Sequence, residues 1–232
     1  MALHVHSLCG YPSLGAFKKG GYKPDKTHWV GYNLVKCAKG ETFKGYSDIT
    51  FNGQNHHIDS NSRPVVIDLF GKWGATKLSI LDVADVDLVP IPSSKLTIFG
   101  ADCTAKLLAD SVSKHLAGSK VSHVLAFKEA RDSDHGKRET ETSEKPKRQS
   151  KDEIFKNLKS GTLPKSGRRI VLVDDVCTQG FHLLATAAFL RNHGLIVDHA
   201  LCLGRTVWEP AENVLAMPPE DLEATLFAFF ED

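Results

Sequence analysis

The hydrophobic pattern is clearest in the last third of the chain. Residues 170–173 (Ile-Val-Leu-Val) form a continuous apolar run, which predicts a strand covered on both faces. A helical stripe follows and ends at Gly194, and it consists of Leu183, Leu184, Ala187, Ala188 and Leu190. Residues 195–203 predict another strand. A strand, a helix and a strand with short connections form a βαβ unit, so we expect these strands to be parallel.

The middle of the chain repeats this alternation. Residues 86–91 predict a buried strand, residues 101–116 a helix that ends at Gly118, and residues 121–127 a further strand. Residues 64–75 begin with proline and favour a helix, although a strand is not excluded. The order of elements predicts an α/β fold, in which a parallel sheet is flanked by helices.

Three segments lack this regularity. Residues 1–62 are polar and weakly periodic, with an edge strand expected at 47–51, and we interpret them as a small N-terminal hood or accessory region. The core then covers residues 63–206 and a C-terminal extension covers 207–232. Residues 128–151 are almost all charged or small and form either a mobile lid or a solvated linker.

Composition narrows the class of protein. A chain of 232 residues, 41% hydrophobic and 25% charged, fits one globular domain with an added subdomain. The net charge of +1 gives no general attraction to nucleic acid, and no apolar run reaches the roughly 18–20 residues that cross a membrane. Five widely spaced cysteines and no visible secretory signal favour the cytoplasm. The apolar residues 226–230 pack either on the core or on a second subunit, which leaves a homodimer open.

Candidate chemistry gathers where the strand at 170–173 ends. Asp174 and Asp175 lie at its carboxyl end, where open parallel sheets bind ligands. The sequence Val-Cys-Thr-Gln-Gly then leads into a helix, whose first N–H groups and dipole suit a phosphate. The carboxylates suit sugar hydroxyls or Mg²⁺. These residues together predict a sugar-phosphate site with magnesium.

Residues 170–180 resemble the phosphoribosyl-pyrophosphate (PRPP) motif of type I phosphoribosyltransferases. Residues 90–95 (Pro-Ile-Pro-Ser-Ser-Lys) resemble the loop that holds pyrophosphate in that family, and residues 128–151 lie where the family has its lid. The order of parts most resembles the ComF-like branch. The resemblance covers roughly residues 64–206, and only the motif at 170–180 is specific.

The resemblance implies a role for each matching residue. Asp174 and Asp175 are the implied catalytic residues, which would hold the ribose hydroxyls directly or through Mg²⁺. Trp208 is a candidate for contact with the base. The implied 5′-phosphate group is Thr178, Gln179, Gly180, Phe181 and His182, and the implied pyrophosphate group is Ser93, Ser94 and Lys95. The candidate lid cations are Lys128, Arg131, Lys137 and Arg138.

The function implied is that of a glycosyltransferase of nucleotide metabolism. It would transfer ribose 5-phosphate from PRPP to a nitrogenous acceptor such as a nucleobase, with Mg²⁺ as cofactor and release of pyrophosphate. The family usually has Thr or Ser at the positions of Gln179 and His182. These departures favour an alternative, a non-catalytic regulatory protein of the same fold that binds PRPP or a nucleotide.

Two further patterns have competing interpretations. Cys177 next to a helix N-terminus fits a reactive thiol, but a small packing residue is the interpretation we favour. Five residues near the N-terminus could bind zinc, yet their irregular spacing favours ordinary loop residues: His4, His6, Cys9, His28 and Cys37.

Overall fold

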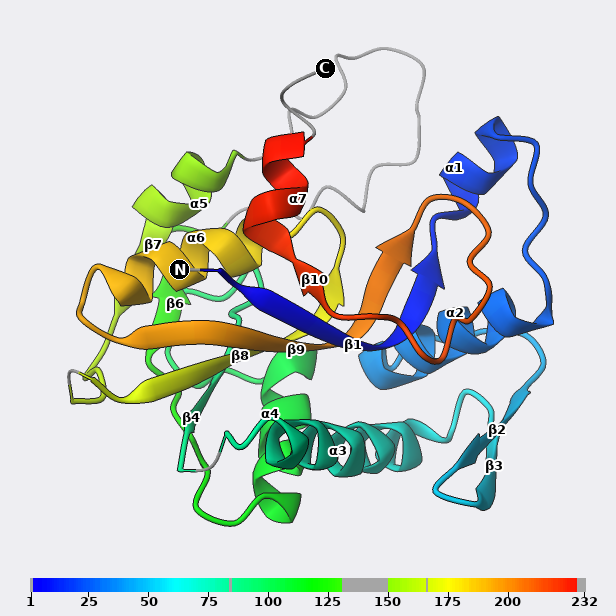
Figure 1. The fold of residues 1–232 in the computed structure, drawn as a ribbon, viewed down its shortest axis with the longest axis horizontal. Coiled ribbons are helices and arrows are strands. Elements are labelled where there is room, and N and C mark those ends of the chain that lie inside the picture. Colours follow the sequence, from blue (N-terminus) through cyan, green and yellow to red (C-terminus); the bar gives the residue numbers. More distant parts are fainter. Residues whose placement is uncertain (1, 84, 131–149, 166, 229–232) are drawn as a thin grey trace.

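The computed structural model describes residues 2–83, 85–130, 150–165 and 167–228. Its centre is a six-stranded sheet in the order β10-β1-β9-β8-β4-β5 (Figure 1). Every neighbouring pair from β1 to β5 is parallel, and β10 is antiparallel to β1. The strands are β1 (His4–Pro12), β4 (Asp87–Pro90), β5 (Lys120–Val121), β8 (Arg169–Cys177), β9 (Ile196–Val207) and β10 (Glu220–Asp221). The predicted α/β class with a largely parallel sheet is confirmed.

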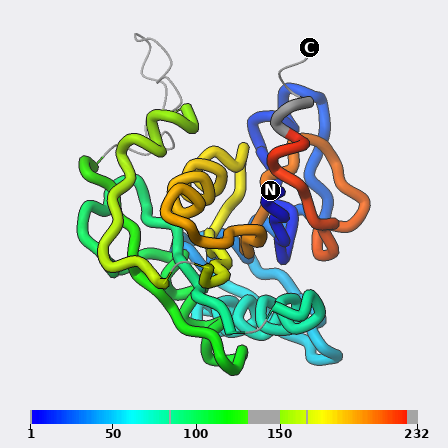
Figure 2. The backbone as a smooth tube through the Cα atoms, turned by 60° about the vertical axis from the view of Figure 1, so that its left-hand side comes forward, coloured from blue at the N-terminus to red at the C-terminus, as the bar shows by residue number. Residues whose placement is uncertain are grey.

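Helices cover both faces of this sheet, so the core has two layers. On β8, Val171 and Val173 pack in the layer beneath α2, α3 and α4, whereas Ile170 and Leu172 pack in the layer beneath α6. Figures 1 and 2 show α3 and α6 on opposite sides of the strands. The helices are α1 (Leu14–Lys19), α2 (Lys26–Lys39), α3 (Arg63–Ile80), α4 (Thr104–His115), α5 (Lys151–Asn157), α6 (Phe181–Arg191) and α7 (Leu222–Ala228).

The segment that begins at Pro64 is helical, which settles the alternative left open by its sequence. Pro64 occupies the first turn of α3, where its missing N–H costs no hydrogen bond. Gly71 lets α4 approach closely, since a Cβ at this position would lie 2.2 Å from Ser111 Oγ. The close pair α3 and α4 then fixes one face of the sheet.

The first strand lies inside the central sheet. The sequence pattern assigns residues 1–62 to an accessory region, whereas β1 pairs with β9 over most of its length, for example His6 with Leu201. The pattern conceals this strand because two of its buried side chains, His6 and Ser7, are polar. The predicted edge strand at 47–51 is confirmed as β2 (Ser47–Phe51), in a hairpin with β3 (Gln54–Ile58).

The predicted strand at 121–127 is divided into two pieces. β5 closes the central sheet, but β6 (Leu125–Phe127) pairs antiparallel with β7 (Leu158–Ser160) in a separate ribbon. Leu158 therefore lies in a strand, although its spacing predicts a continuation of the helix that begins near Ile154. Residues 131–149 of the predicted lid lie outside the described residues.

The C-terminal extension returns to the sheet. β10 pairs with the start of β1, and the Leu222 N–H of α7 donates to the Leu3 carbonyl oxygen at 3.1 Å. Leu222 is buried against α6 and joins the core layer on that face. Within the described ranges, no helix combines the length and apolarity that a membrane crossing needs.

Candidate functional site

The two aspartates lie within β8. The apolar pattern predicts this strand to end at Val173, but β8 continues to Cys177 because β9 extends to Val207 and offers it a partner. Asp174 is opposite Cys202 in this ladder. The Asp175 N–H donates to Asp174 Oδ1 at 2.8 Å, so the two carboxylates lie at one place near the carboxyl end of the sheet.

The charges of this pair are only partly balanced. Burial, and then the negative charge of Asp175, raise the pKa of Asp174 well above its usual range. Lys39 opposes this shift, and its Nζ lies 3.4 Å from Asp175 Oδ2. Lys39 is the last residue of α2, which stops at Gly40 in a left-handed conformation. Lys39 could not be predicted from the sequence, because nothing in residues 1–62 links that segment to the motif at 170–180.

The turn after β8 has the form that the sequence predicts for an anion site. Gly180 has φ of 75° and immediately precedes α6, so the first N–H groups of the helix have no intrahelical partner. A Cβ at Gly180 would also lie 2.6 Å from Leu222 Cδ1, which makes glycine doubly necessary. The Thr206 hydroxyl lies 3.4 Å from that of Thr178 across the adjoining strand ends.

The five residues proposed for the 5′-phosphate form one continuous turn and helix start. Gln179 is exposed, whereas Thr178, Phe181 and His182 are half-buried. The His182 ring is tilted against Phe127, with their centroids 6.2 Å apart. Gln179 therefore points to solvent in a place where a ligand could order it, while His182 already packs against β6.

The loop after β4 begins beside the aspartates. The Ile91 N–H donates to the Val173 carbonyl oxygen at 2.9 Å, which places the following loop next to Asp174. Within it, the Leu96 N–H donates to the Ser93 carbonyl oxygen at 2.8 Å and closes a turn. Ser93 and Lys95 are exposed and Ser94 is half-buried, so this turn presents hydroxyls and one cation to solvent.

Cys103 links this loop to the aspartates. Burial raises the pKa of its thiol, and the charges of Asp174 and Asp175 raise it further, while N–H groups of Lys106 and Ser93 oppose the shift. All four neighbours are thus within electrostatic reach of one sulfur. In the sequence, Cys103 is a single cysteine before a predicted helix, and that pattern does not predict that it lies near the aspartates.

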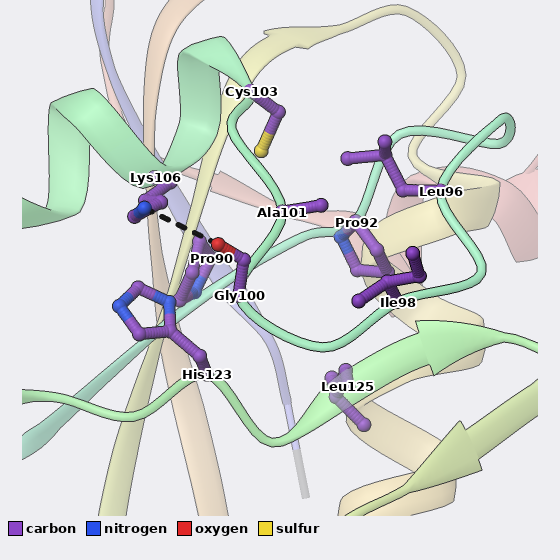
Figure 3. A pocket seen from close by; sticks show the side chains of 10 residues that line it. All are labelled: Pro90, Pro92, Leu96, Ile98, Gly100, Ala101, Cys103, Lys106, His123 and Leu125. Carbon is purple, nitrogen blue, oxygen red and sulfur yellow. Dashed lines mark hydrogen bonds between the residues drawn. The ribbon is translucent and has the colours of Figure 1, made fainter.

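A small cavity lies under the loop, between Pro90, Pro92 and the start of α4 (Figure 3). Its volume of about 20 Å³ suits a single water molecule rather than a substrate. Lys106 closes one side, where its Nζ donates to the Gly100 carbonyl oxygen at 3.2 Å and to Asp102 Oδ1 at 2.7 Å. Lys106 therefore fixes the loop and does not face an open site.

Other candidates are more dispersed. Trp208 directly follows β9 and is 42% exposed, so its ring is available at the same end of the sheet. Lys128 donates from Nζ to the Lys156 carbonyl oxygen at 2.6 Å. The other candidate lid cations, Arg131, Lys137 and Arg138, lie outside the described residues.

The cysteine and histidine candidates have structural partners. Cys177 is buried in the layer under α6 together with Cys202, which supports its interpretation as a packing residue. Cys9 is buried and directs its Sγ to the Leu203 carbonyl oxygen at 3.2 Å. Asp25 caps α2, and the His28 ring contacts this cap through its Nδ1, 2.6 Å from Asp25 Oδ1. Cys9 and His28, two of the five residues considered for zinc, therefore have separate structural roles.

The aspartate pair fits Mg²⁺ by the chemistry of its oxygen donors. Two close carboxylates repel each other, and a divalent cation would relieve that repulsion. Among the residues that the structure describes, no group of three or more His, Cys, Asp or Glu side chains forms a metal site. Mg²⁺ commonly uses one or two carboxylates and completes its shell with water and substrate oxygens, so a site of this size is sufficient.

The sequence profile of the phosphoribosyl transferase domain family matches residues 88–210, just over half of the chain. The chain belongs to this family. Among solved structures it is similar to the UMP synthase of Leishmania donovani, with a TM-score of 0.37 and 17% sequence identity. That similarity covers 76% of this chain and 31% of the other, so the chain spans less than a third of that protein. No curated protein matches the chain.

Proposed function

We propose that the protein is a phosphoribosyltransferase that uses PRPP and Mg²⁺ to transfer ribose 5-phosphate to a nitrogenous acceptor, with release of pyrophosphate. One observation carries the proposal. The acidic pair of β8, the Gly180 turn before α6 and the Ser93–Lys95 turn lie at one end of the sheet. Family membership supports the transferase class.

The three features match the three parts of PRPP. Asp174 and Asp175 accept hydrogen bonds from the ribose hydroxyls, or would hold these hydroxyls indirectly through Mg²⁺. Thr178 and the N–H groups of residues 179–182 bind the 5′-phosphate, because they lie at the positive end of the helix dipole. Ser93, Ser94 and Lys95 bind the pyrophosphate from the neighbouring loop.

The reaction needs little covalent chemistry from the protein. The bond between C1 and pyrophosphate breaks as positive charge develops on the ribose ring, and Lys95 stabilises the negative charge on the departing pyrophosphate. Bound Mg²⁺ would supply further neutralisation of that charge. The acidic pair holds the ribose in place while the acceptor nitrogen attacks C1.

Residues outside the shared core would select the acceptor. We assign this part to the hood region within residues 1–62, and Trp208 is positioned to stack on a planar base. The division at residues 62 and 206 and the lid at 128–151 are parts of the same proposal, as is the ComF-like branch. Free thiols at all five cysteines support a reducing compartment such as the cytoplasm.

The alternative is a regulatory protein that binds PRPP or a nucleotide without transfer. Lys39 favours it, because its ammonium group lies beside Asp175. A cation fixed there competes with Mg²⁺ for the same carboxylate. Gln179 and His182, which replace the hydroxyl side chains usual in the family, also favour the regulatory function.

Pyrophosphate release separates the two functions. Purified protein with PRPP and Mg²⁺ should release pyrophosphate only when a suitable acceptor from a panel of nucleobases and simple amines is present. The variant D174N/D175N should lose this release. Binding of PRPP without release, for every acceptor, would favour the regulatory function, and no binding at all would contradict both.

A further inference from the structure

A second cavity lies at the edge of the sheet, away from the aspartate pair. It has a volume of about 270 Å³ and lies between β1, α3 and the chain segment that precedes β10. Its principal lining residues are His6, Ser7, Trp73, Lys77, Leu215 and Met217. We call it the His6–Lys77 cavity. These residues belong neither to the acidic pair, nor to the turn before α6, nor to the Ser93–Lys95 turn.

The position of α3 separates this cavity from the candidate active site. The helix starts beside the end of α2, where Arg63 Nε donates to the Ala38 carbonyl oxygen at 2.8 Å, one residue before Lys39. Lys77 lies fourteen residues further along the helix, which is about 21 Å at the α-helical rise. A ligand in the cavity would therefore not touch the acidic pair.

One polar atom of the cavity wall has no partner in the part of the chain that the structure describes. His6 is 3% exposed, and its Nδ1 forms no hydrogen bond with those residues. Buried polar atoms are normally paired, because each unpaired one costs free energy. The other ring nitrogen of His6, Nε2, lies 3.2 Å from His199 Nδ1. One side of the His6 ring is thus engaged by β9, and the other side carries the buried, unpartnered nitrogen.

The charge of the wall is positive. Lys77 contributes a cation, and the lining residues include no carboxylate. Within the described part of the chain, Lys77 forms no ion pair, whereas Lys72 on the same helix binds Asp68 at 2.8 Å. Burial lowers the pKa of His6 to about 4, and His199 and Lys77 lower it too, so the ring is neutral at pH 7. An anion is the ligand that this wall would stabilise.

The remaining surface suits a flat ring. Trp73 presents an indole from α3, and Leu215 and Met217 present apolar side chains from the opposite wall. Aromatic rings stack favourably in such a slot. Small-molecule pockets usually enclose about 300–1,000 Å³. This cavity, at about 270 Å³, is slightly smaller, so it fits one ring and not a nucleotide.

We propose that the His6–Lys77 cavity is a second ligand site, which binds a small aromatic carboxylate. The carboxylate pairs with Lys77 and accepts a hydrogen bond from His6 Nδ1–H, while the ring lies against Trp73. The His6 ring can supply that proton when its Nε2 accepts from His199 Nδ1–H. A ligand of this size binds with a dissociation constant of about 1 mM.

Three probes test the chemistry on the full chain: benzoate, benzamide and cyclohexanecarboxylate. Titrations followed by indole fluorescence and calorimetry should show binding of benzoate, with benzamide and cyclohexanecarboxylate each weaker by about tenfold or more. The variant W73F should remove the fluorescence response to benzoate. Equal binding of the charged and neutral probes would overturn the assignment, and no binding of benzoate would show a cavity filled by water only.

Two lysine variants locate the anion. K77M should weaken benzoate binding by about tenfold, whereas the matched control K72M, on the outer side of the same helix, should leave it unchanged. An equal effect of both variants would contradict the site. D174N/D175N should bind benzoate normally, so failure of the phosphoribosyltransferase proposal and failure of this one give different results.

Discussion

Two carboxylates on neighbouring strands, Asp87 of β4 and Asp174 of β8, lie at opposite ends of the same sheet. Asp87 is fully buried and paired in the ladder with Ile170. Its Oδ1 lies 3.3 Å from two nitrogens of Arg168 and 3.6 Å from Lys120 Nζ. Asp174 has another carboxylate, Asp175, as its nearest charged neighbour.

The difference separates a structural acid, Asp87, from the acid that we propose to be functional, Asp174. At the amino end, the protein itself supplies two cations, so the charge of Asp87 helps to hold β4, β5 and β8 together. At the carboxyl end, repulsion is left in place and a single lysine opposes it. Charged groups that a fold leaves poorly satisfied are candidates for ligand binding, because the ligand completes them.

The largest effect that we expect is on turnover. Replacing both carboxylates in D174N/D175N removes the ribose ligands and should lower the rate of pyrophosphate release by about a thousandfold. Circular dichroism of the same variant should match the parent protein, because asparagine preserves the shape of each side chain. If the rate of pyrophosphate release fell by less than tenfold, the aspartates would not belong to the active site.

The next largest effect is on stability, at the opposite end of the sheet. D87A removes a buried carboxylate that pairs with Arg168 and Lys120. It should lower the free energy of unfolding by about 2–3 kcal/mol. For a chain of this size, that corresponds to a fall in Tm of about 4–12 °C. Activity per folded molecule should be unchanged. If D87A proved as stable as the parent, the two carboxylates would not differ as we infer.

A third, smaller effect has the opposite sign. The pKa of Asp174 is raised in the folded protein, so its stabilising contribution is complete below the unfolded pKa of about 3.9 and is lost as pH rises through the folded value. D174N should therefore be at least as stable as the parent protein at pH 7 without Mg²⁺. The gain should vanish near pH 4. Thermal melts across that pH range measure it, and a destabilised D174N at pH 7 would contradict the shift.

The smallest effect concerns Lys39. Its ion pair with Asp175 is partly exposed and contributes at most about 1 kcal/mol, which corresponds to about fivefold in an equilibrium constant. K39M should raise the affinity for Mg²⁺ by up to this factor, because a competing cation is gone. K36M is the matched control, since Lys36 lies one turn earlier on α2 and pairs with Glu41. Equal Mg²⁺ titrations for both variants would leave Lys39 without this role.

The sequence revealed those parts that are local and regular. The apolar runs and helical stripes predicted β4, α4, β8, α6 and β9, and with them the parallel sheet, because these elements bury a continuous side. It missed β1 as a central strand because His6 and Ser7 are buried polar residues. The sequence pattern also extended a predicted helix through Leu158, because one apolar residue fits the spacing of a helix and that of a strand equally well.

Prediction of the site was divided in the same way. The aspartates and the turn at Gly180 are contiguous, so their chemistry could be inferred from one stretch of chain. Lys39 and Cys103 reach the aspartates from distant segments, and only the folded arrangement of α2 and of the loop after β4 shows this. Long-range contacts of this kind leave no local pattern.

The most direct test of the central proposal is a calorimetric titration of PRPP, with Mg²⁺, into the parent protein and into D174N/D175N. We predict saturable binding to the parent protein at one site and a loss of at least about a hundredfold in affinity for the variant. Equal binding to the two proteins, or no binding to the parent, would contradict a ribose-phosphate site at Asp174 and Asp175.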